Sequence, residues 1–117
     1  MKIWIDDVRP APESEGYITC KSVNLAKKLI KAWESGYICN DKAQKEELIE
    51  VFGTKIEFID IDYDAGDYVS DGGDYIKLLD WLEETGRNYP IRIHSMNPVG
   101  IESMRRIIQK NGWIEVK

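Results

Sequence analysis

Acidic side chains that can bind a cation stand at the ends of two short apolar segments of this sequence. They are Asp6 and Asp7 at the end of residues 2–7 (KIWIDD), and Asp62 and Asp64 at the end of residues 55–64 (KIEFIDIDYD). Carboxylates that are brought close together repel one another, so such a group is stable only when it is protonated or bridged by a cation. Sites made of oxygen ligands suit Mg²⁺ best, and Mn²⁺ or Ca²⁺ next. The four acids are therefore candidate metal ligands.

A third apolar segment, residues 90–94 (PIRIH), ends in His94, which is the only histidine of the chain. Beside acids, a histidine can act as a general acid or base, or donate to a phosphate. Ser95 can hold a phosphoryl oxygen, and we expect the Asn97 side chain to be free to donate to a substrate. Arg9 follows the first pair of acids and can clamp a phosphate through two parallel N–H groups. These four residues are the candidate catalytic and phosphate-binding groups.

Each of these residues also has an ordinary structural explanation. Acids at strand ends commonly cap the next helix or turn, and a histidine at a sheet rim commonly bonds a backbone carbonyl. An exposed arginine such as Arg9 commonly forms a surface salt bridge. Asp60 shares a strand face with Asp62 but would be buried and need a partner, so its role stays open. The acidic, glycine-rich loop at residues 67–74 is either a mobile lid or a solvated loop.

The segments that must position these residues alternate between strand and helix patterns. Strands are expected at residues 2–6, 17–21, 55–62, 90–94 and 113–116, and helices at residues 23–35, 41–51, 74–85 and 101–110. Such alternation predicts a parallel sheet covered by helices on both faces. We expect a three-layer α/β fold of the flavodoxin type, with five strands in the order 2-1-3-4-5 and a proline loop in place of the first crossover helix. Ligands bind such sheets beyond the carboxyl ends of the strands, where the strand order reverses.

Composition excludes several classes of protein. The chain has 117 residues, 43% of them hydrophobic, which fits one domain over residues 1–117. A net charge of −5 argues against a long nucleic-acid track, since phosphate neutralisation dominates that kind of affinity. A single phosphate or one strand end stays compatible with it. No apolar stretch reaches membrane-spanning length and no signal peptide is evident, so we expect a cytoplasmic protein. Cys20 and Cys39 are expected to be buried thiols, because their spacing fits no zinc or redox motif.

Three motifs together resemble a known family. They are the opening KIWIDDVRPAPE, the D-x-D-x-G of Asp62, Asp64 and Gly66, and HSMNPVG at residues 94–100. As a set they are similar to the cyclic-phosphate-processing receiver-like proteins, which are small bacterial and phage relatives of response-regulator receiver domains. The likeness runs from residue 2 to about residue 110. It implies a receiver-like fold and a role in hydrolysing cyclic phosphates, for example in RNA repair.

The resemblance also implies roles for individual residues. Receiver domains keep an acid pair after strand 1, a phosphorylated Asp at the end of strand 3, a Ser or Thr after strand 4 and a Lys after strand 5. By position, Asp6 and Asp7 look like the metal-binding pair and Asp62 like the phosphoacceptor. Ser95 corresponds to the hydroxyl residue, and His94 and Asn97 are what the cyclic-phosphate group adds.

The sequence departs from the family pattern at a few places. Tyr63 and Ala65 stand where the family has a second histidine and a leucine, and only Lys117 lies near the end of the expected fifth strand. The expected helix at residues 41–51 looks like an insertion relative to the shortest members. A missing second histidine would weaken or reassign catalysis.

Two hypotheses for the function follow. The first is a metal-assisted phosphodiesterase that uses Mg²⁺ or Mn²⁺ to open a cyclic phosphate, on a nucleotide or on a 2′,3′-cyclic RNA end. In that hypothesis His94 and Asp62 are catalytic, and no membrane partner is involved. The alternative is a non-catalytic receiver-like module that signals or binds a partner. Metal binding separates them, because only the first requires it.

Overall fold

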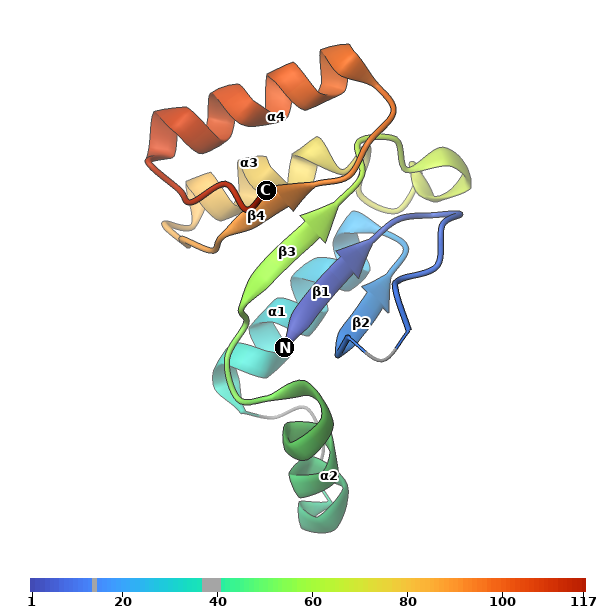
Figure 1. The fold of residues 1–117 in the computed structure, drawn as a ribbon, viewed down its shortest axis with the longest axis vertical. Helices are drawn as coiled ribbons and strands as arrows, with labels where there is room; N and C mark the ends of the chain where they lie inside the picture. The colour runs from blue at the N-terminus through green and yellow to red at the C-terminus, as the bar shows by residue number, and fades with distance from the viewer. Residues whose placement is uncertain (14, 37–40) are drawn as a thin grey trace.

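The structure is a computed structural model of the chain, and it describes residues 1–13, 15–36 and 41–117. Within these residues, strands form one parallel sheet in the order β2-β1-β3-β4 (Figure 1). The strands are β1 (Lys2–Ile5), β2 (Tyr17–Cys20), β3 (Phe58–Ile61) and β4 (Ile91–Ile93). The α/β class and the order of the first four strands are therefore confirmed.

The expected fifth strand at residues 113–116 forms only an isolated bridge. Glu115 pairs in parallel with Ile91. The Ile91 N–H donates to the carbonyl of Ile114 at 2.9 Å, and the Val116 N–H donates to the carbonyl of Ile91 at 2.8 Å. The segment thus lies beside β4, where the predicted order puts it, but β4 is short and leaves room for one bridge. A five-stranded sheet is not confirmed.

Helices follow the predicted positions closely. They are α1 (Val23–Ser35), α2 (Lys42–Phe52), α3 (Ile76–Glu84) and α4 (Pro98–Asn111), with a 3₁₀ turn at Gly66–Tyr68. The Ser22 hydroxyl accepts from the Leu25 N–H at 3.1 Å and so caps α1. Helix α4 begins three residues before the prediction, because Asn97 caps it and Pro98 is compatible with the first turn.

The helices of the core pack on one face of the sheet, so the expected third layer is wrong for the residues described. Strand residues in the core alternate onto that face, and they meet buried side chains of α1, α3 and α4. Figure 1 shows α1 and α3 behind the sheet. Crossovers between parallel strands are right-handed. The steps from β2 to β3 and from β3 to β4 run in one direction, which places both helices on the same face. Only the step from β1 to β2 runs the other way, and it is made by the proline loop.

Helix α2 stands apart from the sheet, beyond the amino ends of the strands (Figure 1). It has no buried residues, as the sequence predicted for a peripheral helix. Cys20 is buried, as expected, whereas Cys39 lies outside the described residues. Among the helices of the described residues, none is long and apolar enough to cross a membrane.

Candidate cation centre

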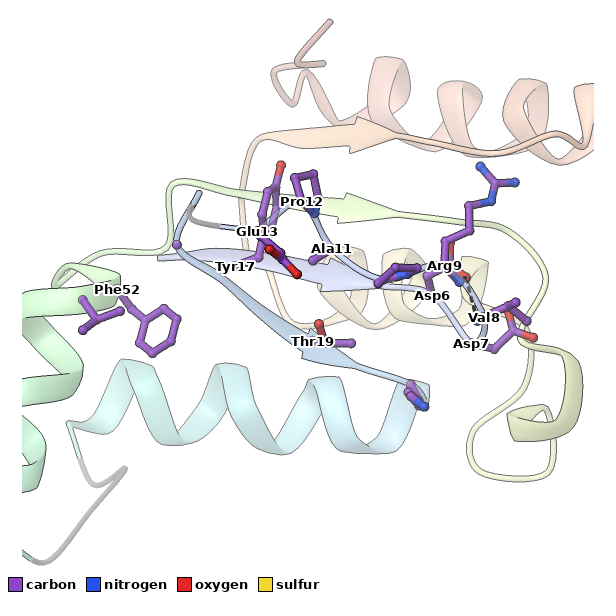
Figure 2. A pocket seen from close by; sticks show the side chains of 14 residues that line it. Asp6, Asp7, Val8, Arg9, Ala11, Pro12, Glu13, Tyr17, Thr19 and Phe52 are labelled. Carbon is purple, nitrogen blue, oxygen red and sulfur yellow. Dashed lines mark hydrogen bonds between the residues drawn. The ribbon is translucent and has the colours of Figure 1, made fainter.

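The turn after β1 is built around the Asp6 carboxylate. Its Oδ1 accepts hydrogen bonds from the N–H groups of Val8 at 2.9 Å and Arg9 at 3.0 Å (Figure 2). The indole N–H of Trp4 donates to the carbonyl of Arg9 at 2.8 Å and ties the same loop to the sheet. An acid followed by two unpaired amides forms such a turn locally. The turn fixes Asp6 at the carboxyl end of β1, where its second oxygen faces the end of β3.

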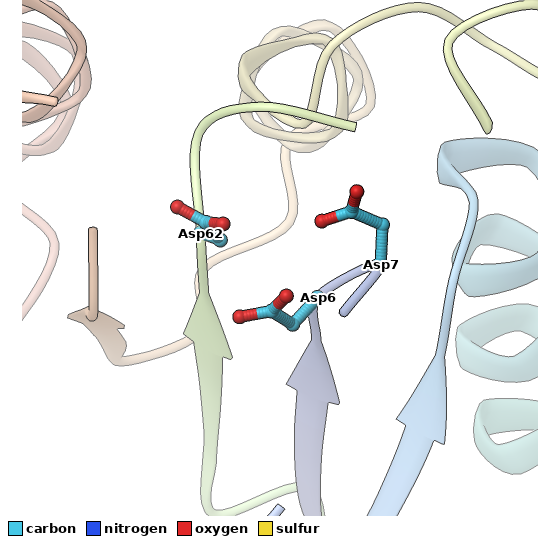
Figure 3. A group of neighbouring side chains, drawn as sticks. All are labelled: Asp6, Asp7 and Asp62. Atoms are coloured by element: carbon cyan, nitrogen blue, oxygen red, sulfur yellow. The ribbon is translucent and has the colours of Figure 1, made fainter. Parts of the chain in front are cut away.

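Three carboxylates converge at the carboxyl ends of β1 and β3. One oxygen each of Asp6, Asp7 and Asp62 lies within 4.8 Å of the other two (Figure 3). Asp6 is 2% exposed and Asp62 is 8% exposed, while Asp7 is half-buried. The structure therefore brings together three of the four predicted ligands.

Gly66 lets the chain after β3 approach Asp7 closely. Its φ is +53°, and a Cβ at this position would lie 2.1 Å from Asp7 Oδ2. Asp62 Oδ1 accepts from the following Tyr63 N–H at 2.7 Å, which holds the Asp62 carboxylate at the turn. The glycine of the D-x-D-x-G motif thus has a steric role in the carboxylate cluster.

Electrostatics differ between the two adjacent acids. Burial would raise the pKa of Asp6, but the amides of Val8 and Arg9 and the ring of His94 lower it below the usual value. The pKa of Asp7 is raised, by burial and by the charges of Asp6 and Asp62. Within the described residues, no lysine or arginine forms an ion pair with any of the three. An all-oxygen cluster with excess negative charge fits a hard divalent cation.

His94 lies between two carboxylates on the uncovered face of the sheet. Its Nδ1 is 2.6 Å from Asp60 Oδ1, and its Nε2 is 2.9 Å from Asp6 Oδ2. The ring stacks on Trp4 with centroids 3.9 Å apart and an interplanar angle of 9°. A neutral imidazole has one N–H, so the two short contacts need a second proton, on the ring or on a carboxyl group. The histidine is therefore held as a proton carrier next to the carboxylate cluster.

Asp60 is the residue whose role the sequence left open. It is 1% exposed, and its Oδ2 accepts from the Tyr17 hydroxyl at 2.9 Å and lies 3.7 Å from the Arg92 guanidinium. Sequence reasoning did not select Trp4 or Tyr17. The signal that was available is strand alternation, since Trp4 shares a face with Asp6 and stands opposite Asp60 in the register.

The remaining predicted residues lie outside the carboxylate cluster. Asp64 is exposed, because β3 ends at Ile61 and the chain then turns. Arg9 is exposed and is held through its backbone. Ser95 Oγ accepts from the Asn97 N–H at 3.2 Å. Asn97 Oδ1 accepts from Gly100 N–H at 3.0 Å, so the expectation of a free Asn97 side chain is wrong for its oxygen, which caps α4.

The two departures from the family pattern have clear positions. Tyr63 packs against the core, and a Cβ at Gly100 would lie 2.4 Å from its ring. This position faces α4 rather than the carboxylates. Lys117 is 78% exposed and pairs with Glu115 at 2.9 Å.

Comparison with known proteins gives one result. The sequence model of the family described as the cyclic-phosphate processing receiver domain matches residues 1–110. No curated protein and no solved structure matches the chain. The matched residues contain all three carboxylates, His94 and the whole four-stranded sheet. The chain therefore belongs to the family of cyclic-phosphate processing receiver domains.

Proposed function

We propose that this chain hydrolyses cyclic phosphate esters with the help of a divalent cation, Mg²⁺ or Mn²⁺, held by Asp6, Asp7 and Asp62. The observation that carries the proposal is the cluster itself, with three carboxylate oxygens within 4.8 Å of one another and His94 bonded to its edge. The chain's membership of a cyclic-phosphate processing family gives the class of substrate. The substrate is a nucleotide or the end of an RNA.

The reaction needs charge neutralisation and proton transfer. Water adds to phosphorus, one P–O bond of the ring breaks, and the leaving oxygen takes a proton to give a phosphomonoester with a free hydroxyl. A bound cation would neutralise the phosphoryl oxygens and stabilise charge as it develops. His94 carries the proton that the leaving oxygen needs, or takes one from the attacking water. A variant of the same proposal has Asp62 attack phosphorus and form an aspartyl phosphate, which water then hydrolyses.

Three further residues would orient the phosphate. The Arg9 guanidinium is exposed at the edge of the groove beside Asp6, where it can reach phosphoryl oxygens. The Ser95 hydroxyl can still donate, because its printed contact uses the oxygen as an acceptor. The amide nitrogen of Asn97 can donate in the same way, since only its oxygen caps α4. We leave Asp64 out of the cation centre because it is exposed and away from the cluster.

The test is a ³¹P NMR time course on 2′,3′-cyclic nucleotides and short cyclic-phosphate RNAs, with and without Mg²⁺ or Mn²⁺. We expect metal-dependent ring opening that His94→Ala and Asp62→Asn each lower by about 100-fold or more. Asp64→Asn is the matched control, because it removes the same charge two residues away from Asp62. Equal activity of Asp62→Asn and Asp64→Asn would contradict the cation centre.

A non-catalytic receiver-like module remains the second candidate. The position of Lys117 favours it, because this lysine pairs with Glu115 instead of reaching the carboxylates. Calorimetric titration with Mg²⁺ separates the two candidates. Binding that Asp62→Asn removes supports the hydrolase, while a protein that binds no divalent cation would be a module of the second kind.

A further inference from the structure

A groove of about 540 Å³ opens on the uncovered side of the sheet, between β2 and the loop that follows β1. Its volume lies within the range of sites that bind small molecules. Asp6 and Asp7 line one end, and Phe52 at the end of α2 lines the other (Figure 2). The loop that forms its wall is held by Trp4 and by the Asp6 carboxylate. The groove is therefore continuous with the proposed cation centre.

The two ends of this groove differ in charge. Its cations, Arg9 and Lys21, follow the carboxyl ends of β1 and β2 and so lie toward the carboxylates. The far end carries two aromatic side chains, Tyr17 and Phe52, and its one charged lining residue is Glu13 (Figure 2). Lys2 lies 5.6 Å from the centre of the Tyr17 ring but does not line the groove. A phosphate is thus favoured at the near end and disfavoured at the far end.

We infer that the far end of the groove binds an uncharged, planar organic group, of the nucleobase type, that belongs to the molecule whose cyclic phosphate is opened. This inference rests on the proposed function and narrows its substrate to a single nucleoside cyclic phosphate. An aromatic side chain stacked on a base contributes about 1–3 kcal/mol to binding. The exposed Thr19 hydroxyl lies between the two ends and can donate to the sugar or the base.

An RNA strand fits the groove less well. Its additional phosphates would lie toward Glu13, with no lining cation to neutralise them. The floor strand β2 has four residues, which span roughly 13 Å at about 3.3 Å per residue. That length accommodates one nucleoside beside the cation centre.

The experiment compares three substrates with Mg²⁺ present: adenosine 2′,3′-cyclic phosphate, ethylene phosphate, and an RNA tetranucleotide with a 2′,3′-cyclic end. We expect kcat/KM, corrected for uncatalysed rates, to be about tenfold or more higher for the adenosine compound than for ethylene phosphate. The tetranucleotide should be several-fold poorer than the adenosine compound. Thr19→Trp fills the groove and should reduce the preference for adenosine over ethylene phosphate to about twofold or less. Glu13→Lys should raise kcat/KM for the tetranucleotide several-fold.

Gln109→Trp is the matched control, because it places the same bulky ring on exposed α4, away from the groove. Equal kcat/KM for the three substrates, or an unchanged preference in Thr19→Trp, would overturn the inference. If the native chain opens none of the three, the proposed function fails, and binding of adenosine alone then tests the groove. NMR shifts at Thr19 and Phe52 amides that Thr19→Trp abolishes would support the groove site, and absence of adenosine binding would overturn it.

Discussion

The two faces of the sheet have different compositions and different tasks. On the face toward the helices, strand residues such as Ile3, Ile59 and Ile61 are fully buried in one apolar core. On the other face, the same strands present Trp4, Asp60 and their neighbours under a loop. Burial of apolar area supplies most of the stability of a domain this size. The covered face therefore holds the fold, which leaves the uncovered face free to carry charged and hydrogen-bonding groups.

The uncovered face forms a continuous polar chain that ends at the carboxylates. The Tyr17 hydroxyl bonds Asp60, Asp60 bonds His94, and His94 bonds Asp6. No buried side-chain nitrogen or oxygen among the described residues lacks a hydrogen-bond partner. A fully satisfied network of this kind fixes side-chain positions. The comparison teaches that the missing crossover helix exposes a site where other sheets of this type have a packed layer.

The largest effect is expected on the covered face. Ile59→Ala should lower the free energy of unfolding by about 2–5 kcal/mol, because it leaves a cavity in the core. Thr19→Ala, on the exposed strand surface of the other face, should change it by no more than about 0.5 kcal/mol. Urea denaturation measures both values. Similar losses in the two variants would break the proposed division between the faces.

Gly66→Ala tests the steric contact behind the carboxylates. Gly66 and Gly86 both have positive φ, +53° and +69°, but a Cβ at Gly86 would meet nothing within 4 Å. The left-handed conformation should cost each alanine variant about 1–2 kcal/mol. Gly66→Ala should in addition displace Asp7 and weaken Mg²⁺ binding by about tenfold in calorimetry. Equal Mg²⁺ affinity in the two variants would argue against the role of Gly66.

The adjacent acids should respond in opposite directions when no cation is present. The folded-state pKa of Asp7 is raised, so ionising Asp7 destabilises the fold as the pH rises from its unfolded pKa through the raised one. The pKa of Asp6 is lowered, so its stabilising contribution is present above the unfolded pKa and is lost as the pH falls through the folded one. At pH 7 in EDTA, Asp7→Asn should raise the Tm and Asp6→Asn should lower it, each by a few degrees.

Scanning calorimetry at neutral and acidic pH checks this pair. The gain of Asp7→Asn should disappear at a pH well below both pKa values of Asp7, where the native carboxyl is also neutral. Added Mg²⁺ should stabilise the native chain more than either variant, because each variant lacks a ligand. Tm changes of the same sign in EDTA would contradict the assignment.

The smallest effect concerns the far end of the polar chain. Tyr17→Phe removes one donor to Asp60, which keeps His94 and Arg92, so the loss should be about 1 kcal/mol. Tyr68→Phe is the control at an exposed tyrosine. The ring nitrogens of His94, the only histidine, give an unambiguous ¹⁵N signal. Tyr17→Phe should shift that signal and Tyr68→Phe should not.

Much of this protein was predictable from short stretches of sequence. Alternation of apolar residues located β1 and β3, and Ser22 and glycine marked the ends of α1, because these signals act over a few residues. The acids at the carboxyl ends of the strands were identified as one site for the same reason. The family followed from the motifs, and the match over residues 1–110 confirms it.

Tertiary structure decided which of these residues meet. Asp60 joined His94 and Asp64 did not join the carboxylates, although both lie two residues from Asp62. Their fates depend on where β3 ends and on which strands lie beside it, and no local pattern contains that information. The same holds for the uncovered face. Its existence follows from the direction of each crossover, so it becomes visible only when all the strands are placed in one sheet.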